Sequence, residues 1–147
     1  MEEFNTLEKV IDLFKSVNGY GEENVIFVAY KDMQKCSGML GSMNYPYDGL
    51  LINQTEKGIG MFFLEQSGMV WVQDVAKMSL KKDKYVFIPK EEIKKIKIKN
   101  YAFIRTNVKR ISIDVKDGRE YKLYAKLDEK DIVYQNENFT KFISNQV

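Results

Sequence analysis

The residue types that carry most enzyme chemistry are scarce in this chain of 147 residues. Histidine is absent, which excludes Ser-His and Cys-His nucleophile pairs, histidine-ligated zinc and a histidine-based pH switch. The one cysteine, Cys36, has no second thiol for a disulfide or a metal cluster, so we interpret it as a small hydrophobic residue. The 21 aspartates and glutamates form no recognisable catalytic pair. We therefore expect no catalytic residue, no cofactor and no metal, and a protein that is not an enzyme.

Lysines are concentrated in one stretch, residues 81–99. The candidate contacts with an anionic surface are Lys81, Lys82, Lys95, Lys97 and Lys99. Each surface lysine contributes about 1 kcal/mol beside an acidic membrane. The alternative is a solvated strand face, on which lysine discourages aggregation between sheet edges. Asp83, Glu91 and Glu92 lie among these lysines and weaken their combined charge.

A second group of side chains is aromatic or contains sulfur, a composition that is favoured at adaptable interfaces. The candidate interaction surface consists of Met69, Trp71, Tyr45 and Tyr47. The same residue types are ordinary core residues, so both interpretations stay open. A nucleic-acid partner is not expected, because the net charge is only +2 and the basic residues are almost all lysine.

Periodicity predicts the elements that position these residues, beginning with a helix. Apolar residues recur at helical spacing over 4–17, and Asn18-Gly19 supplies the end, so the N-terminal helix lies within residues 1–19. The β-branched and aromatic run 25–30 predicts a buried strand. Residues 50–52 and 59–64 flank a loop that ends at Gly58, which predicts a hairpin.

The middle of the chain is harder to assign. Residues 69–72 predict a further strand, whereas residues 74–83 fit a short helix, a loop or an edge element. Residues 86–88 resume strand character and must end at Pro89, which cannot donate to a ladder.

Strict alternation marks the second half of the chain. Ile96 and Ile98 alternate with lysines, which predicts a strand with one buried and one wet face, and residues 100–107 predict a loop or a loose hairpin end. Asp117-Gly118 is the strongest hairpin signal in the chain. Apolar residues within 132–146 then share one helical face, with Asn136 or Asn138 as the N-cap. We predict a single domain over 1–147, with antiparallel strands over 25–127.

Four segments resemble a bacterial pleckstrin-homology-like (PH-like) domain, in the broad superfamily that includes GRAM domains. They are DGLLINQTEKGIGMFF (48–63), FIPKEEIKKIKIK (87–99), ISIDVKDGREYKLY (111–124) and NENFTKFISNQ (136–146). In that order they are similar to the second and third strands, the fourth strand with the entry to the fifth, the last hairpin and the C-terminal helix. The resemblance implies an α+β fold: a PH-like barrel of two near-orthogonal antiparallel sheets, with a C-terminal capping helix and, here, an extra N-terminal helix.

The chain departs from the family in two further respects. Residues 65–83 intervene between the third and fourth strands, and we expect them to add a hairpin strand or a lid. Family members that bind phosphoinositides use a basic cluster, rich in arginine, between the first two strands. Lys31 and Lys35 lie in that area without an arginine, so recognition of a lipid headgroup is not carried over.

The resemblance implies a non-catalytic binding scaffold. We expect a cytoplasmic module that binds a protein partner, or itself, through a sheet edge or the 65–83 region. The alternatives are peripheral binding to anionic membrane lipids through the lysine-bearing strands, and a barrel that binds a small ligand. An acidic N-terminus and the lack of a long apolar run favour the cytoplasm over secretion or a membrane helix.

Overall fold

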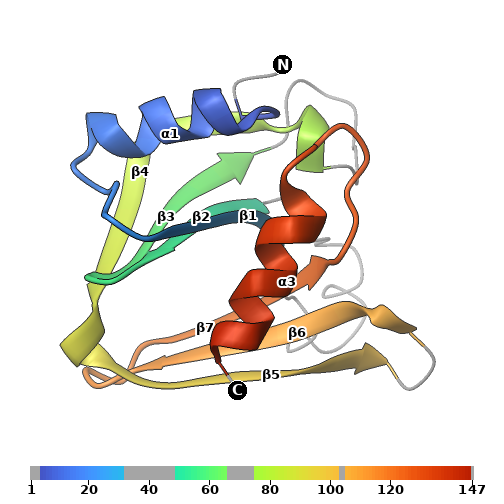
Figure 1. The fold of residues 1–147 in the computed structure, drawn as a ribbon. Coiled ribbons are helices and arrows are strands. Elements are labelled where there is room, and N and C mark those ends of the chain that lie inside the picture. Colours follow the sequence, from blue (N-terminus) through green and yellow to red (C-terminus); the bar gives the residue numbers. More distant parts are fainter. Residues whose placement is uncertain (1–3, 32–48, 66–74, 103–104, 147) are drawn as a thin grey trace.

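The computed structural model describes residues 4–31, 49–65, 75–102 and 105–146, and these residues form an α+β structure (Figure 1). In chain order the helices and strands are α1 Leu7–Ser16, β1 Asn24–Lys31, β2 Gly49–Thr55, β3 Gly58–Glu65, β4 Ser79–Pro89, β5 Ile93–Ala102, β6 Arg105–Val115, β7 Glu120–Lys126 and α3 Gln135–Asn145. Two single-turn 3₁₀ helices, η1 (Val75–Lys77) and η2 (Lys90–Glu92), precede and follow β4.

The described strands form one antiparallel sheet in the order β4-β3-β2-β1-β7-β6-β5. Among the described residues, β4 and β5 each have a partner strand on one side only and do not pair with each other, so the sheet is not closed and the prediction of a barrel is wrong. η2 lies between the two end strands, and each of its ends is bonded to a different hairpin. At its start, the Lys90 N–H donates to the carbonyl of Lys57, between β2 and β3, at 2.8 Å. At its end, the Glu92 carbonyl accepts the N–H of Lys116, between β6 and β7, at 2.9 Å. β4 and β5 therefore meet at this corner and diverge from it (Figure 1).

The two predicted sheets are two halves of this one sheet. β1–β4 form the first half and β5–β7 form the second, and β1 joins β7 through the described pairs Tyr30–Tyr124 and Lys31–Leu123. Within the first half, β1–β3 are buried on both faces, which explains why β1 is an uninterrupted apolar run instead of an alternating one.

Two hydrophobic clusters account for this burial. The α1-side core lies between α1 and the outer face of the first half and includes Phe4, Val10, Phe14, Leu51, Phe62 and Met78. The α3-side core lies between the two halves and includes Phe27, Ile52, Met61, Ile111, Phe139 and Phe142. All of these side chains are at most 2% exposed. The two rings of Phe139 and Phe142 on α3 lie 5.0 and 4.6 Å from the ring of Phe27.

α3 also completes the backbone hydrogen bonding where β1 and β7 separate. The buried Gln135 side chain accepts a bond from the Val28 N–H at 2.9 Å and donates to the carbonyls of Val28 and Lys126 at 3.1 and 2.8 Å. Asn138 donates to the Ile26 carbonyl at 2.9 Å. Asn138 is therefore not the N-cap that the sequence predicts, and neither is Asn136, since both lie within α3. Buried backbone groups need partners, and these amides supply them.

Local predictions fare better than long-range ones. α1 ends as expected, with Asn18 in the left-handed region at a φ of 58° and the Gly19 N–H donating to the Phe14 carbonyl at 2.7 Å. Both predicted hairpins form, and Gly118 has a φ of 100° in its turn. Of the two alternatives for residues 100–107, the loop is wrong and the hairpin end is confirmed, because β5 extends to Ala102, β6 begins at Arg105 and the two strands pair up to these residues. Within 65–83, η1 and the start of β4 belong to the core, since Val75, Met78 and Leu80 are buried in the α1-side core.

Candidate functional site

The edge of the sheet formed by β5 is the first component of the site. β5 pairs with β6 and has no partner strand on its other side among the described residues. A strand in this position presents a row of unpaired N–H and C=O groups, which is a template for a further strand. Ile93 and Lys95 pair with consecutive residues of β6, so the ladder has a bulge at Lys94.

The side chains of β5 divide between two faces, as its alternation predicts. Ile96 and Ile98 pair with Ile113 and Ile111 and contact the α3-side core, in which they remain half-buried. The lysines face the opposite way and are exposed: Lys95, Lys97 and Lys99 lie across from Asp114, Ser112 and Arg110 of β6. None of these three lysines forms an ion pair with a described residue.

A groove separates β5 from the last turns of α3 and forms the second component. It consists of two hollows with volumes of about 580 and 340 Å³. Ile96 and Gln146 line both hollows, so the two are consecutive parts of one groove that follows β5 from Ile93 to Asn100. Seven residue steps of an extended strand cover about 24 Å. We call this the β5–α3 groove.

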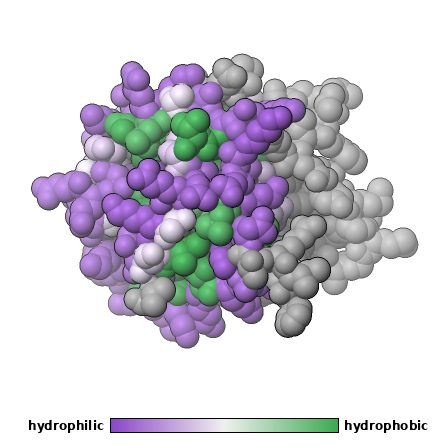
Figure 2. Space-filling view, turned by 45° about the vertical axis from the view of Figure 1, so that its right-hand side comes forward, coloured by the Kyte–Doolittle hydropathy of each residue, from purple (hydrophilic) through white to green (hydrophobic). Residues whose placement is uncertain are grey.

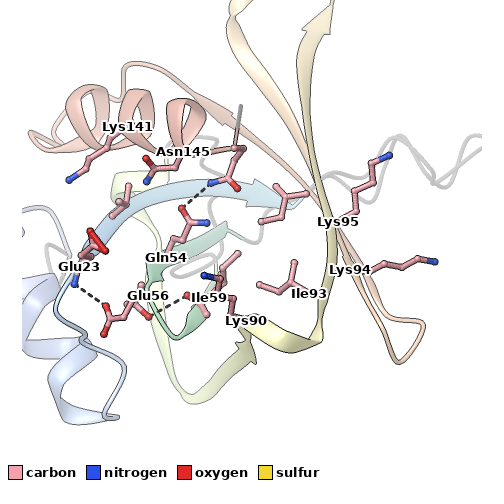
Figure 3. Close-up of a pocket in the computed structure, with 15 residues that line it drawn as sticks. Glu23, Gln54, Glu56, Ile59, Lys90, Ile93, Lys94, Lys95, Lys141 and Asn145 are labelled. Atoms are coloured by element: carbon pink, nitrogen blue, oxygen red, sulfur yellow. Dashed lines mark hydrogen bonds between the residues drawn. The ribbon is translucent and has the colours of Figure 1, made fainter.

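The apolar floor of the groove comes from both of its sides. Ile93, Ile96 and Ile98 contribute from β5, and Ile143 contributes from α3. In Figure 3, Ile93 points toward the interior of the larger hollow, whereas Lys94 and Lys95 extend away from it. Gln146 lies at the junction of the two hollows, where its Nε2 donates to Gln54 Oε1 at 2.9 Å and to the Phe142 carbonyl at 3.0 Å. The bond to Gln54 attaches the end of α3 to β2.

Charges around the groove are predominantly basic. Lys90, Lys94, Lys95 and Lys141 line the larger hollow, and Lys99 and Lys109 line the smaller one. The two carboxylates at the larger hollow are Glu23 and Glu56. Glu56 is already engaged, because one of its oxygens accepts the Glu23 N–H at 2.9 Å (Figure 3) and the other accepts the Glu22 N–H at 3.1 Å. The bonds from the Glu23 and Glu22 backbone lower the pKa of Glu56, so it stays ionised as a local backbone cap.

The structure assembles only part of the predicted lysine site. Lys95, Lys97 and Lys99 lie together on β5, but Lys81 lies on β4 at the other end of the sheet order, with its Nζ 3.8 Å from a carboxylate oxygen of Glu65. Lys82 belongs to β4, and its side chain is outside the described residues. Sequence reasoning missed Lys141, Ile143 and Gln146, because a helical period shows that α3 has an apolar face but not which strand its last turns approach.

The second predicted surface cannot be compared with the structure. Met69, Trp71, Tyr45 and Tyr47 all lie in segments outside the described residues, as does Cys36.

β4 carries a smaller pocket, of about 220 Å³, beside the loop that follows α1. Tyr85 and Phe87 line it from β4, and Phe87 is 39% exposed. The hydroxyl of Tyr85 is buried without a hydrogen-bond partner, and burial raises the pKa of this phenol. Its ring packs at 4.8 Å from that of Phe62 and 6.3 Å from that of Phe14. Tyr85 is thus chiefly a packing residue of the α1-side core.

Neither a protein-family model, nor a curated protein, nor a solved structure matches this chain. Within the described ranges, no three His, Cys, Asp or Glu side chains gather in a way that could hold a metal ion. Of the helices that the structure describes, none has the length and apolar character to cross a membrane. The β5–α3 groove, with its open strand edge and basic border, is the feature from which a function can be inferred.

Proposed function

We propose that this chain is a non-catalytic, cytoplasmic binding module of PH-like architecture, which binds a protein partner by accepting an extended segment as an additional strand along β5. One observation carries the proposal: the edge of β5, which no described strand pairs, lies beside a groove whose opposite wall is formed by the last turns of α3 and, along the larger hollow, also by residues of β1–β3. The backbone of a bound segment would pair with β5, while alternate side chains would enter the groove. Strand addition of this kind draws affinity from main-chain hydrogen bonds and specificity from side-chain pockets.

The PH-like part of the proposal is supported by the order and placement of the elements. Four antiparallel strands are followed by three more and by a C-terminal helix whose aromatic side chains lie between the two halves of the sheet. The open sheet departs from the expected pattern, whereas α1 is the extra N-terminal helix that the sequence predicts. α1 covers the outer face of the first half (Figure 1), which leaves the second half as the part with an accessible edge and face.

Hydrogen bonds and apolar burial would share the stabilisation of the complex. A net gain of about 0.5–1.5 kcal/mol per backbone hydrogen bond is typical. Side chains that cover Ile96 and Ile98, which are only half-buried, would add roughly 25 cal/mol for each Å² of apolar surface removed from water. Figure 2 shows that the hydrophobic residues on the viewed face form separate patches bordered by hydrophilic ones. Separate patches of this kind do not form a broad hydrophobic interface. A narrow groove beside an edge strand instead suits an extended segment.

Selection from a random peptide library on the purified chain, followed by alternate N-methylation of the selected peptide, tests this proposal. N-methylation of every second residue removes the donors of one edge and keeps the side chains. We expect binding to be lost when the methyl groups face β5 and retained when they face away. Equal binding by both methylated peptides would contradict it. So would selected peptides whose binding shifts the NMR resonances of no β5 residue.

Anionic lipid is a second candidate ligand, favoured by the exposed row of Lys95, Lys97 and Lys99 on one strand face. A flat row of lysines meets an acidic bilayer favourably even without a headgroup pocket. Flotation with phosphatidylserine vesicles at low salt separates the candidates, because strand addition predicts that the chain stays in the unbound fraction. The small-ligand barrel receives less support, since the α3-side core occupies the space between the two described halves of the sheet.

A further inference from the structure

We infer that the segment accepted by β5 alternates acidic with apolar residues and belongs to another protein, not to the β5 strand of a second copy. This inference rests on the proposed strand addition and specifies the partner of the same groove. Residues directly opposite one another on paired strands share a face of the sheet. The two faces of β5 therefore determine which residue types an added strand can carry.

On the exposed face, an added strand would place its side chains against a row of lysines. Lys95, Lys97 and Lys99 follow one another at every second position. Their neighbours across the ladder on β6 neutralise little of this charge: Asp114 lies opposite Lys95, but Ser112 and Arg110 lie opposite the other two. Opposite charges in directly facing positions stabilise a strand pair, whereas like charges destabilise it. Glutamate or aspartate at every second position of the bound segment meets this requirement.

On the groove face, the same strand would direct its intervening side chains at apolar surface. Ile96 and Ile98 remain half-buried on β5, and Ile143 faces the groove from α3. The two hollows beside them follow the strand in succession. Apolar residues that alternate with the acidic ones would fill these hollows and complete the α3-side core at its open border. A uniformly acidic segment would leave this surface uncovered.

A second copy of this chain does not satisfy both faces at once. Antiparallel pairing of β5 with the β5 of another copy keeps the two groove faces on the same side only when lysine lies opposite lysine. A shift by one residue would bring lysine opposite isoleucine, but it would turn the groove face of one copy to the exposed side of the other. Charge complementarity thus favours a partner with carboxylates over symmetric self-association through this edge.

Fluorescence anisotropy with four labelled heptapeptides on the whole chain tests the inference. In the first peptide, four glutamates alternate with three valines. In the second and third, glutamine or lysine replaces every glutamate, and in the fourth a central proline replaces one valine of the glutamate peptide. We expect the glutamate peptide to bind about tenfold more tightly than the glutamine peptide, from three favourable cross-strand pairs. The lysine and proline peptides should not bind measurably.

Charge reversal on the protein side supplies the matched control. The double change Lys97→Glu and Lys99→Glu should abolish binding of the glutamate peptide and allow binding of the lysine peptide. The control Lys130→Glu changes charge at an exposed position in the loop before α3 and should leave all four affinities unchanged. Circular dichroism melting of each variant checks that the fold is intact.

The remaining outcomes separate failure of this inference from failure of the proposed function. Equal binding of the glutamate and glutamine peptides, with both lost on N-methylation, would overturn the acidic pattern and leave strand addition standing. Equal binding of the proline and glutamate peptides would mean attraction by charge alone and would overturn both. A dimer in light scattering that the glutamate peptide dissociates would show that a second copy occupies β5 and overturn the choice of partner. If the wild-type chain floats with phosphatidylserine vesicles and the double variant does not, the lysines would be assigned to a membrane instead.

Discussion

The two end strands of the sheet are both edges by topology, yet they differ in what surrounds them. β4 is packed against the rest of the molecule: Ile88 is fully buried, Tyr85 packs on Phe14 of α1, and Lys81 forms an ion pair with Glu65. β5 keeps its isoleucines half-buried and its lysines exposed, beside a groove instead of a helix in direct contact. β4 therefore contributes mainly to the fold, with Phe87 as an exposed apolar side chain. β5, whose three lysines form no ion pair with a described residue and whose groove is open, is available for a partner.

The same contrast separates the two halves of the sheet. β1–β3 are covered on both faces by the α1-side and α3-side cores, whereas β5–β7 bury one face and expose the other. Substitutions in the first half should therefore change stability and leave partner binding alone. Substitutions on β5 should change partner binding and have a smaller effect on stability. The following experiments test this division, in order of decreasing effect on stability.

Phe14→Ala should cause the largest loss, about 3–5 kcal/mol in the free energy of unfolding, because it leaves a cavity in a fully packed cluster. Phe14 is completely buried, and its ring lies 5.1 Å from that of Phe62. Urea denaturation followed by far-ultraviolet circular dichroism measures the change. The folded fraction of the variant should bind the groove peptides with unchanged affinity, and weakened binding would break the division between the two halves.

Gln135→Leu should cost about 1–3 kcal/mol for the Val28 N–H alone, since the substitution leaves this buried donor without a partner. The Val28 and Lys126 carbonyls lose their bonds from Gln135 as well. Asn136→Ala removes an amide at the next position, where the side chain is exposed and bonds to Asp128 at 2.9 Å. This control should change the midpoint of urea unfolding much less. Equal losses for the two variants would show that Gln135 does not join β1 to α3.

Ile98→Ala on β5 should destabilise the fold by about 1 kcal/mol, less than the 2–5 kcal/mol expected for Ile88→Ala on β4. The difference follows from burial, because Ile88 is fully buried and Ile98 is not. Denaturation of the two variants side by side measures it. A larger loss for Ile98→Ala would mean that the groove face of β5 is part of the closed core, and the contrast between the edges would then be wrong.

Glu56→Gln should produce a small change that depends on pH. Hydrogen bonds from the Glu23 and Glu22 backbone lower the pKa of Glu56 from its ordinary value of 4.5. The ionised carboxylate therefore stabilises the fold above about pH 4.5, and this contribution is lost as pH falls through the lowered pKa. Thermal melts of wild type and variant should differ at neutral pH and converge under acid conditions. A constant difference at every pH would mean that another group carries the effect.

Lys97→Ala should have the smallest effect on stability, within about 0.5 kcal/mol, as is usual for exposed positions. Lys97 is exposed, lies opposite Ser112 and forms no ion pair with a described residue. The same variant should weaken binding of an acidic peptide, which isothermal titration calorimetry would detect. Loss of stability together with unchanged binding would reverse the role assigned to β5.

The sequence predicts the local elements of this fold because each depends on neighbouring residues. The end of α1 at Asn18-Gly19, the buried run of β1 and the Asp117-Gly118 hairpin all follow from spacing and turn chemistry. Predictions that depend on distant residues fail. Asn138 resembles an N-cap, but its partner is the carbonyl of Ile26, more than a hundred residues earlier. The open sheet likewise depends on the long-range bonds of η2, from Lys90 to Lys57 and from Lys116 to Glu92. The alternation of apolar and polar residues along a strand carries no information about such bonds.

The candidate site follows the same rule. The alternation of lysine and isoleucine on β5 is visible in the sequence, and the structure places these residues as expected. The groove is not visible, because its other wall comes from Ile143 and Gln146 on and after α3, and their approach to Ile96 is a tertiary contact. Lysine density alone also grouped Lys81 with the β5 lysines, although the sheet order places them on opposite end strands.

Site-resolved amide hydrogen exchange, measured by NMR with and without a bound acidic peptide, tests the central claim most directly. We predict that alternate amides between Lys94 and Asn100, those that face away from β6, become protected by at least an order of magnitude when the peptide binds. Amides along the outer edge of β4 should keep their exchange rates. New protection on β4 in place of β5, or peptide binding that protects no amide of β5, would contradict the account.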